Sequence, residues 1–220
     1  MADPFKDRAE AGRTLASLLA PYANRSDVVV LALPRGGVPV AFEVARALNA
    51  PLDLFLVRKL GVPGHEELAM GAIASGGGRV LNDEVVAHLR ISDELINAVA
   101  AGEELELERR ERAYRGERPM PAVDGRTVIL IDDGVATGST MRAAVAALRQ
   151  KSPAYLVVAV PTAAASTASE LRAEVDDFVA VIEPEEFFAV GQWYENFSQT
   201  TDAEVRDLLE RTAQRPPPVD

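Results

Sequence analysis

Residues 128–140 read Val-Ile-Leu-Ile-Asp-Asp-Gly-Val-Ala-Thr-Gly-Ser-Thr, and the interpretation of the whole chain starts from this stretch. Four aliphatic residues without polar alternation predict a strand that is buried on both faces, as at the centre of a parallel sheet. Residues 134–140 combine two glycines with three hydroxyl side chains, which predicts a loop, and residues 141–149 have the alanine-rich pattern of a helix. The predicted order is a strand, a loop of small residues and a helix N-terminus.

The loop and the acid pair before it suit two different parts of one ligand. Backbone N–H groups and the helix dipole can close around a phosphate, with the hydroxyls of Ser139 and Thr140 as further donors. Asp132 and Asp133 would repel a phosphate, whereas carboxylates accept charge-assisted hydrogen bonds from the vicinal hydroxyls of a sugar. A ribose 5-phosphate satisfies both halves.

The same stretch resembles the signature of the type I phosphoribosyltransferases, enzymes that use 5-phosphoribosyl-1-pyrophosphate (PRPP). That signature has four hydrophobic residues, two acids, three variable positions and Thr-Gly-small-Thr, and every fixed position is matched. The resemblance implies that Asp132 and Asp133 are catalytic, hold the ribose hydroxyls and contact a Mg²⁺ cofactor indirectly, through PRPP or water. It also implies that the 5-phosphate is bound by Ala136, Thr137, Gly138, Ser139 and Thr140.

Other interpretations of the stretch stay open. An ordinary strand and helix joined by a polar turn with two solvated acids would have a similar sequence. A receiver-type phosphoacceptor aspartate would explain the acids but not Thr-Gly-Ser-Thr. A Walker A loop would need a lysine after the glycine, and Gly-x-Gly-x-x-Gly does not occur in the sequence, so these two kinds of nucleotide site have little support.

Composition limits the classes of partner. A chain of 220 residues can bury a full core, and 48% hydrophobic and 26% charged residues are typical of a soluble globular protein. The net charge of −11 speaks against nucleic acid or an anionic membrane as partner. There is no cysteine and no apolar run of about 18 residues, so we expect a cytoplasmic protein.

Alternating strands and helices through residues 27–182 predict an α/β fold with a central parallel sheet flanked by helices. The resemblance adds a flexible lid and a small C-terminal hood. We expect one phosphoribosyltransferase domain over residues 1–212, divided into a core at 27–182, a lid hairpin with a helical insertion at about 60–118, and a hood at 183–202. The proline-rich residues 213–220 are expected to form a disordered tail.

A second strand-loop-helix unit is predicted at residues 27–48. Its loop reads Pro-Arg-Gly-Gly, in which glycines allow close backbone approach and the guanidinium can bind phosphate. Alone, this pattern is more typical of a plain turn. Beside the first motif it resembles the family's pyrophosphate loop, which often carries a strained or cis peptide, and this implies that Arg35, Gly36 and Gly37 bind pyrophosphate.

The next predicted strand, residues 52–57, stops at Arg58 and Lys59. Cations at the carboxyl end of a buried strand lie at the edge where open α/β sheets bind ligands, although a solvated strand end is the alternative. The resemblance implies a basic group for the pyrophosphate here. Lys59 is the first candidate, as a catalytic residue, and Arg58 is the second, as a pyrophosphate-binding residue.

Residues 71–74 and 79–81 are predicted to form a hairpin around Ser-Gly-Gly-Gly, and the resemblance implies a lid that excludes water from PRPP. Ser92 is predicted to cap a helix that runs to Gly116, acidic at its start and basic at its end. A solvated helix is the favoured interpretation. The alternative is that its basic end reaches PRPP in a neighbouring subunit.

Residues 187–197 contain the chain's only tryptophan and three of its seven phenylalanines, which indicates either a stacking surface for a flat ligand or core packing. The sequence pattern of this stretch resembles the hood of the 6-oxopurine phosphoribosyltransferases. The resemblance implies a base site at Phe188, Val190, Trp193 and Glu195. Two positions depart from that pattern, because Glu195 stands where Asp is usual and Ala136 stands where the hypoxanthine-guanine enzymes have Asp. The acceptor base is therefore open.

The sequence thus predicts a Mg²⁺-dependent phosphoribosyltransferase that transfers the 5-phosphoribosyl group from PRPP to a nitrogenous, purine-like base and releases pyrophosphate. The alternative is a catalytically inactive regulator that senses PRPP or a nucleotide. The sequence contains no set of residues that matches the active site of a serine or metal hydrolase. By analogy with the family, we expect a homodimer.

Overall fold

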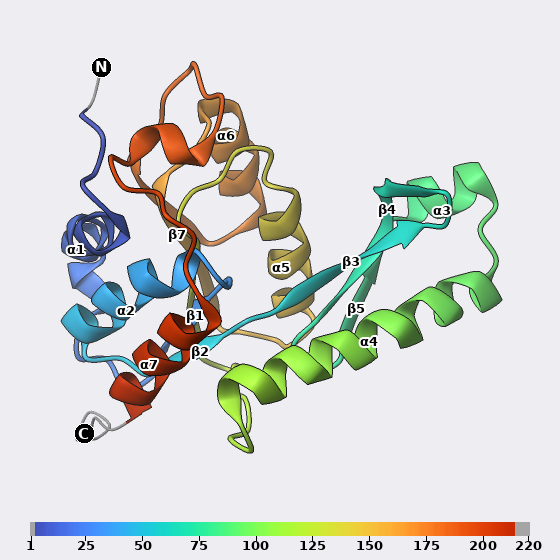
Figure 1. The fold of residues 1–220 in the computed structure, drawn as a ribbon, viewed down its shortest axis with the longest axis horizontal. Helices are drawn as coiled ribbons and strands as arrows, with labels where there is room; N and C mark the ends of the chain where they lie inside the picture. The colour runs from blue at the N-terminus through green and yellow to red at the C-terminus, as the bar shows by residue number, and fades with distance from the viewer. Residues whose placement is uncertain (1–2, 214–220) are drawn as a thin grey trace.

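The computed structural model describes residues 3–213, which contain two separate sheets (Figure 1). The larger sheet has five parallel strands in the order β2-β1-β6-β7-β8, so the predicted central parallel sheet is confirmed. The smaller sheet is antiparallel, in the order β3-β4-β5. The strands of the larger sheet are β1 (Val28–Ala32), β2 (Leu52–Leu54), β6 (Thr127–Ile131), β7 (Tyr155–Thr162) and β8 (Asp177–Ile182).

Helices cover both faces of the larger sheet because its central strands are apolar on both sides. In β1, Val28 and Val30 face one core and Val29 and Leu31 face the other. The first core is closed by helices α1 (Arg8–Leu18), α2 (Gly37–Leu48) and α7 (Asp202–Ala213). The second core is closed by α5 (Ser139–Arg149) and α6 (Ala165–Glu174).

The strand order creates one switch point. From β1 the chain crosses through α2 to β2 on one side, and from β6 it crosses through α5 to β7 on the other. The loops after β1 and β6 therefore lie side by side at the carboxyl edge of the sheet. In open α/β sheets this is the crevice in which ligands bind.

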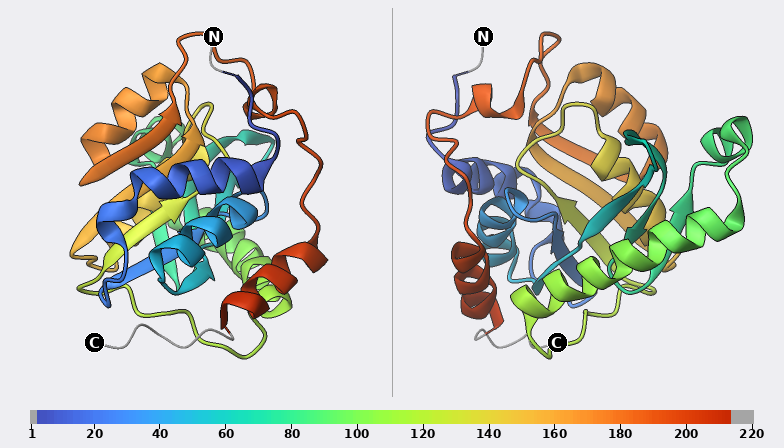
Figure 2. Two further views of the ribbon diagram at one scale, coloured as in Figure 1. Left: turned by 90° about the vertical axis from the view of Figure 1, so that its left-hand side faces the viewer. Right: turned by 45° about the vertical axis from the view of Figure 1, so that its right-hand side comes forward.

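The smaller sheet and two helices form an arm that projects from the core, with α4 running along it (Figure 1, Figure 2). The arm consists of β3 (Val57–Val62), β4 (His65–Ala74), β5 (Gly78–Leu81), α3 (Asp83–Leu89) and α4 (Asp93–Arg115). The predicted hairpin around residues 75–78 is present, with Gly78 already in β5. Helix α4 has the predicted Ser92 cap and ends at Arg115, with Gly116 as its C-cap.

One predicted strand is divided between the two sheets. The prediction was a single strand at 52–57 that ends before Arg58, but β2 ends at Leu54, and Arg58 and Lys59 lie inside β3. Between these strands the Phe55 N–H still bonds to β1, whereas the Leu56 N–H bonds to the Ser75 hydroxyl of the arm. The apolar run is continuous, so its sequence gives no sign of the change of sheet.

The hood follows β8 and contains a 3₁₀ turn, η2 (Val190–Trp193), before the chain descends to α7 (Figure 2). Phe5 pairs with Tyr194 as an isolated bridge and packs with Ala11 and Trp193, so the N-terminal segment and the hood share a small core. A second short turn, η1 (Ala20–Tyr22), follows α1. The predicted tail at 213–220 falls almost entirely outside the described residues.

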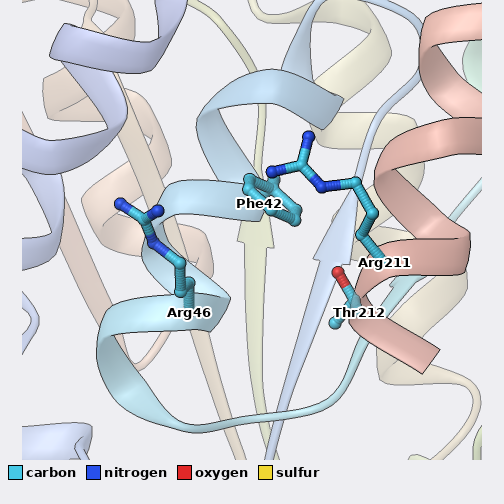
Figure 3. A pocket seen from close by; sticks show the side chains of 4 residues that line it. All are labelled: Phe42, Arg46, Arg211 and Thr212. Atoms are coloured by element: carbon cyan, nitrogen blue, oxygen red, sulfur yellow. The ribbon is translucent and has the colours of Figure 1, made fainter. Parts of the chain in front are cut away.

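Two contacts fix the periphery of the core. Arg211 of α7 lies over the Phe42 ring of α2 at 4.7 Å, beside a small cavity that Arg46 and Thr212 also line (Figure 3). At the base of the arm, the Arg115 guanidinium contacts the Asp53 carboxylate at 3.0 Å, and both side chains are buried. No helix within residues 3–213 is both long and apolar enough to cross a membrane.

Candidate active site

Two glycines of the loop after β1 lie against the end of β6 and the acid pair that follows it. A Cβ atom added to Gly36 would lie 2.0 Å from Oδ2 of Asp133, and one added to Gly37 would lie 2.7 Å from the backbone oxygen of Ile131. A side chain at Gly37 would meet the backbone of the acid-bearing loop, and a side chain at Gly36 would displace the Asp133 carboxylate. The Pro34–Arg35 peptide is cis, as the family resemblance implies. The predicted pyrophosphate loop and the predicted ribose acids therefore form one continuous surface.

The predicted phosphate loop, residues 136–140, is held by two side chains from outside it. Gly138 has φ 72°, which glycine adopts without strain, and it forms the N-cap of α5. The Thr167 hydroxyl donates to the Ala136 carbonyl at 2.6 Å, and the Arg142 guanidinium donates to the Thr137 carbonyl at 2.7 Å. Both side chains bond to carbonyl oxygens of the loop. The N–H groups in the first turn of α5 therefore remain available to an anion.

The carboxylates of Asp132 and Asp133 lie in different surroundings. The Asp132 carboxylate accepts the Asp133 backbone N–H at 2.8 Å, and the Asp133 carboxylate accepts from Nε of Arg8 at the same distance. Burial raises the pKa of Asp132 well above its usual value, and the neighbouring Asp133 charge adds to this. Burial also raises the pKa of Asp133, but Arg8 opposes that rise. Asp133 is therefore the acid that stays ionised more easily.

Arg8 ties this acid to the hood. Its guanidinium also donates to the Ser198 carbonyl at 2.7 Å and lies 4.1 Å from the centre of the Phe197 ring. The Tyr194 hydroxyl donates to the Asp133 carbonyl at 2.5 Å, and burial raises the pKa of Tyr194, which keeps that donor protonated. Sequence reasoning missed Arg8 because it is 125 positions from Asp133 and lies in no recognisable motif.

The two cations after β2 point to opposite faces of the arm. The Arg58 guanidinium contacts the Glu103 carboxylate of α4 at 2.5 Å. Lys59, the next residue on the strand, lines a cavity of about 400 Å³ together with Ser139 and Arg142 of α5. Lys59 thus shares a cavity with the phosphate end of the predicted site, and Arg58 does not line it. Both assignments stay predictions.

The four predicted base-site residues lie in different environments. Val190 packs on the acid loop, because a Cβ on Gly134 would lie 2.5 Å from its side chain. Trp193 is 8% exposed and packs in the core that the hood shares with Phe5. Phe188 is 86% exposed, and Glu195 is exposed while its backbone N–H bonds to Phe5. Of these four residues, Val190 adjoins the acid loop, and the base site stays a prediction.

The acids fit a Mg²⁺ ion that is shared with a substrate. Within residues 3–213, no group of three or more His, Asp or Glu side chains could form a protein cage for a metal. Mg²⁺ is usually bound by one or two carboxylates together with substrate phosphates and water. Asp132 and Asp133 provide such a donor pair, and a cation there would favour their ionised forms.

The fold and the two joined loops define an α/β protein with a crevice suited to a phosphorylated sugar. Residues 5–195 match the phosphoribosyl transferase domain. Two proteins of Mycobacterium tuberculosis strains, provisionally named phosphoribosyl transferases, are 46% identical over 207 residues, which is 94% of this chain and 46% of theirs. The chain thus spans about half the length of these curated relatives.

Two of the solved structures that are similar to this chain illustrate the range of the likeness. The crystal structure of TT1426 from Thermus thermophilus is 44% identical, with a TM-score of 0.83 that covers 94% of this chain and 98% of that one. The AQ2163 protein from Aquifex aeolicus, at 12% identity and a TM-score of 0.51, shares the fold and covers 92% of this chain. The chain belongs to the phosphoribosyl transferase family.

Proposed function

We propose that this chain transfers the 5-phosphoribosyl group from PRPP to a ring nitrogen of a purine-like base and releases pyrophosphate. The observation that carries the proposal is the contact between the Gly36–Gly37 backbone and the Asp132–Asp133 pair at the switch point of the sheet. This contact supports the proposal because the loop proposed to bind the diphosphate adjoins the two acids proposed to bind the sugar, and the first turn of α5 follows on the same loop as the acids.

The chemistry needs positioning and charge stabilisation rather than a protein nucleophile. The acceptor nitrogen forms a bond to C1 of the ribose, the bond from C1 to the pyrophosphate oxygen breaks, and the acceptor loses a proton to solvent. Asp132 and Asp133 orient the ribose hydroxyls and stabilise the positive charge that develops on the ring. The α5 N-terminus holds the 5-phosphate, which fixes C1 relative to the acceptor.

Several finer statements belong to this proposal. Mg²⁺, when bound by PRPP and held indirectly by the acid pair through PRPP or water, would supply positive charge that favours departure of pyrophosphate. Lys59 and Arg35 supply further positive charge. A purine-like acceptor, cytoplasmic location and a homodimer complete the proposed description; the acceptor and the homodimer follow from the resemblance described above, and the location follows from the composition.

The test is pyrophosphate release from PRPP with Mg²⁺ against a panel of purines, pyrimidines and small amines. Asp132→Asn with Asp133→Asn should abolish release. The matched control is Glu117→Gln with Asp124→Asn, which removes the same charge at two exposed positions before β6. Near wild-type release in the first pair would refute the proposal. PRPP binding without release on any acceptor would favour the sensing regulator instead.

A further inference from the structure

One side of helix α4 is buried and the other side is exposed (Figure 1). Ile96, Ala100 and Leu107 lie on the buried side and join the first core. The exposed side carries a stripe of apolar or small residues, which we call the α4 stripe, at spacings of three, four and three: Leu95, Ala98, Gly102 and Leu105. Leu105 is 71% exposed, and a Cβ added to Gly102 would meet nothing within 4 Å. Spacings that alternate between three and four are typical of the seam along which two helices pack.

The α4 stripe is symmetric about residue 100, and this symmetry indicates its partner. Leu95 and Leu105 each lie five positions from residue 100. Ala98 and Gly102 each lie two positions from it. When two copies of α4 lie antiparallel with a two-fold axis at this point, each leucine faces a leucine and Ala98 faces Gly102. Because the small residues meet in the middle, the helix axes can approach to about 8 Å. The stripe is therefore complementary to a second copy of itself.

The charge order along α4 favours an antiparallel over a parallel arrangement. Asp93 and Glu94 lie in the first turn of the helix, whereas Arg109 and Arg112 lie near its end. With the two-fold axis at residue 100, Arg109 lies about 3–5 Å along the helix axis from the two acids of the second copy. The pair that Arg109 forms with Glu106, at 2.7 Å, is on the exposed surface and contributes little to stability, so Arg109 can change partners at little cost. A parallel arrangement would bring like charges to the same height.

The position of α4 in the molecule leaves room for a second copy. The helix runs along the projecting arm and ends at Arg115, which is fixed to the core through Asp53 (Figure 1, Figure 2). In the antiparallel arrangement, the two copies of Arg115 lie about 45 Å apart along the helix axis. The two cores therefore stand at opposite ends of the contact, whereas a parallel arrangement would place both at the same end.

We propose that two copies of this chain associate through the α4 stripe, antiparallel and with the two-fold axis at residue 100. The contact consists of four residue layers, which is smaller than a standard interface, so we expect a weak dimer with a Kd of roughly 10 µM. The proposal goes beyond the homodimer of the proposed function because it assigns the surface. Its evidence is the stripe and the charge order, and the transferase activity does not enter.

The first experiment is sedimentation velocity of the full chain over a range of about 1–200 µM, which brackets the expected Kd. Leu105→Glu places a charge in the contact and should raise the Kd at least about tenfold. Leu18→Glu is the matched control, since it makes the same change at an exposed leucine of α1 that is 49% exposed. It should leave the Kd within about twofold of wild type. Equal Kd values for the two variants would overturn the interface.

The second experiment tests the register. The chain contains no cysteine, so a disulfide between introduced cysteines reports contact between two copies. In the proposed register, position 95 faces position 105 of the second copy, while each position lies about 15 Å along the helix axis from its own copy. A disulfide needs Cα atoms within about 7 Å of each other. A mixture of Leu95→Cys and Leu105→Cys chains should therefore form the mixed disulfide under mild oxidation, and neither variant alone should form a dimer.

The outcomes separate the interface from the proposed function. Self-linked dimers of either cysteine variant, or no mixed disulfide, would overturn the antiparallel register. A dimer whose Kd is unchanged by Leu105→Glu would overturn the interface and leave the homodimer standing. A chain that stays monomeric over the whole concentration range and still releases pyrophosphate from PRPP would overturn the interface while leaving the transferase activity intact.

Discussion

The core loops and the arm present their functional groups in different ways. The core loops place backbone and short side chains in contact with one another, and a single added carbon at Gly36 or Gly37 would collide with the opposite loop. The arm carries long, exposed cations on secondary structure that projects from the core. At Gly102 of α4, an added Cβ would meet nothing within 4 Å.

This difference separates two kinds of constraint. Groups in the core loops depend on geometry fixed to a fraction of an ångström, so small substitutions there should have large effects. Groups on the arm depend on charge and on how the arm is anchored, so single charge changes should have modest effects. The ion pair between Arg115 and Asp53 anchors the base of the arm. Because both residues are buried, this anchor depends on exact geometry, as the core loops do.

Breaking the anchor should give the largest effect. Arg115→Met leaves the buried Asp53 carboxylate without its cation, and such a loss typically costs about 3–5 kcal/mol of unfolding free energy. Burial already raises the pKa of Asp53 while Arg115 opposes the rise. The double variant Asp53→Leu with Arg115→Met removes both charges and should recover much of the lost stability. Urea unfolding measures both variants, and an equal loss in the two would contradict this account.

A methyl group at Gly37 should have the next largest effect. The new Cβ of Gly37→Ala would lie 2.7 Å from the Ile131 oxygen and 2.9 Å from the Asp132 Cα, which are backbone atoms of the acid loop. We expect a loss of about 1–3 kcal/mol in stability and a roughly 100-fold fall in pyrophosphate release. Gly102→Ala is the control on the arm, and it should stabilise the chain by about 0.5–1 kcal/mol. Similar losses of activity in Gly37→Ala and Gly102→Ala would contradict the difference proposed between the core loops and the arm.

Removing Arg8 should change the pH dependence of the core site. The groups that face the Asp133 carboxylate and its backbone are Arg8, Asp132 and Tyr194. Arg8→Gln removes the main group that opposes the effect of burial, so the pKa of Asp133 should rise further and the acidic limb of activity should move to higher pH. We expect activity at neutral pH to fall roughly tenfold, with recovery as pH rises.

Stability gives an independent readout of the same change. A carboxyl whose folded pKa is raised binds its proton more tightly when folded, so the folded state loses stability as pH rises above the unfolded value of about 3.9. Arg8→Gln should therefore be less stable than wild type at pH 7, and the difference should shrink as pH falls to about 4. A pH-independent difference would show that Arg8 acts through packing alone.

The sequence predicted the core loops well because their information is local. A buried strand, two acids and a Thr-Gly-small-Thr loop are contiguous in residues 128–140, and Pro34–Gly37 follows the first strand directly. Arg8 was not predicted, since its contact with Asp133 depends on how the N-terminal helix docks against the hood. The division of residues 52–57 between two sheets was also missed, because both halves are equally apolar. Long-range docking and a change of sheet leave no local pattern.

The adjacent pair Arg58 and Lys59 gives the smallest expected effect and the sharpest contrast within the arm. Strand alternation turns Arg58 towards Glu103 and Lys59 towards the cavity beside Ser139. If Lys59 reaches the bound substrate, Lys59→Met should lower kcat/KM for PRPP about three- to tenfold, because one point charge on a flexible stem is lost. Arg58→Met removes the same charge one residue away, and because the Arg58 guanidinium is bound by Glu103, it should change kcat/KM by less than about twofold. A larger effect at Arg58 than at Lys59 would reverse the order of the two candidates and make Arg58, the second candidate, the pyrophosphate-binding residue.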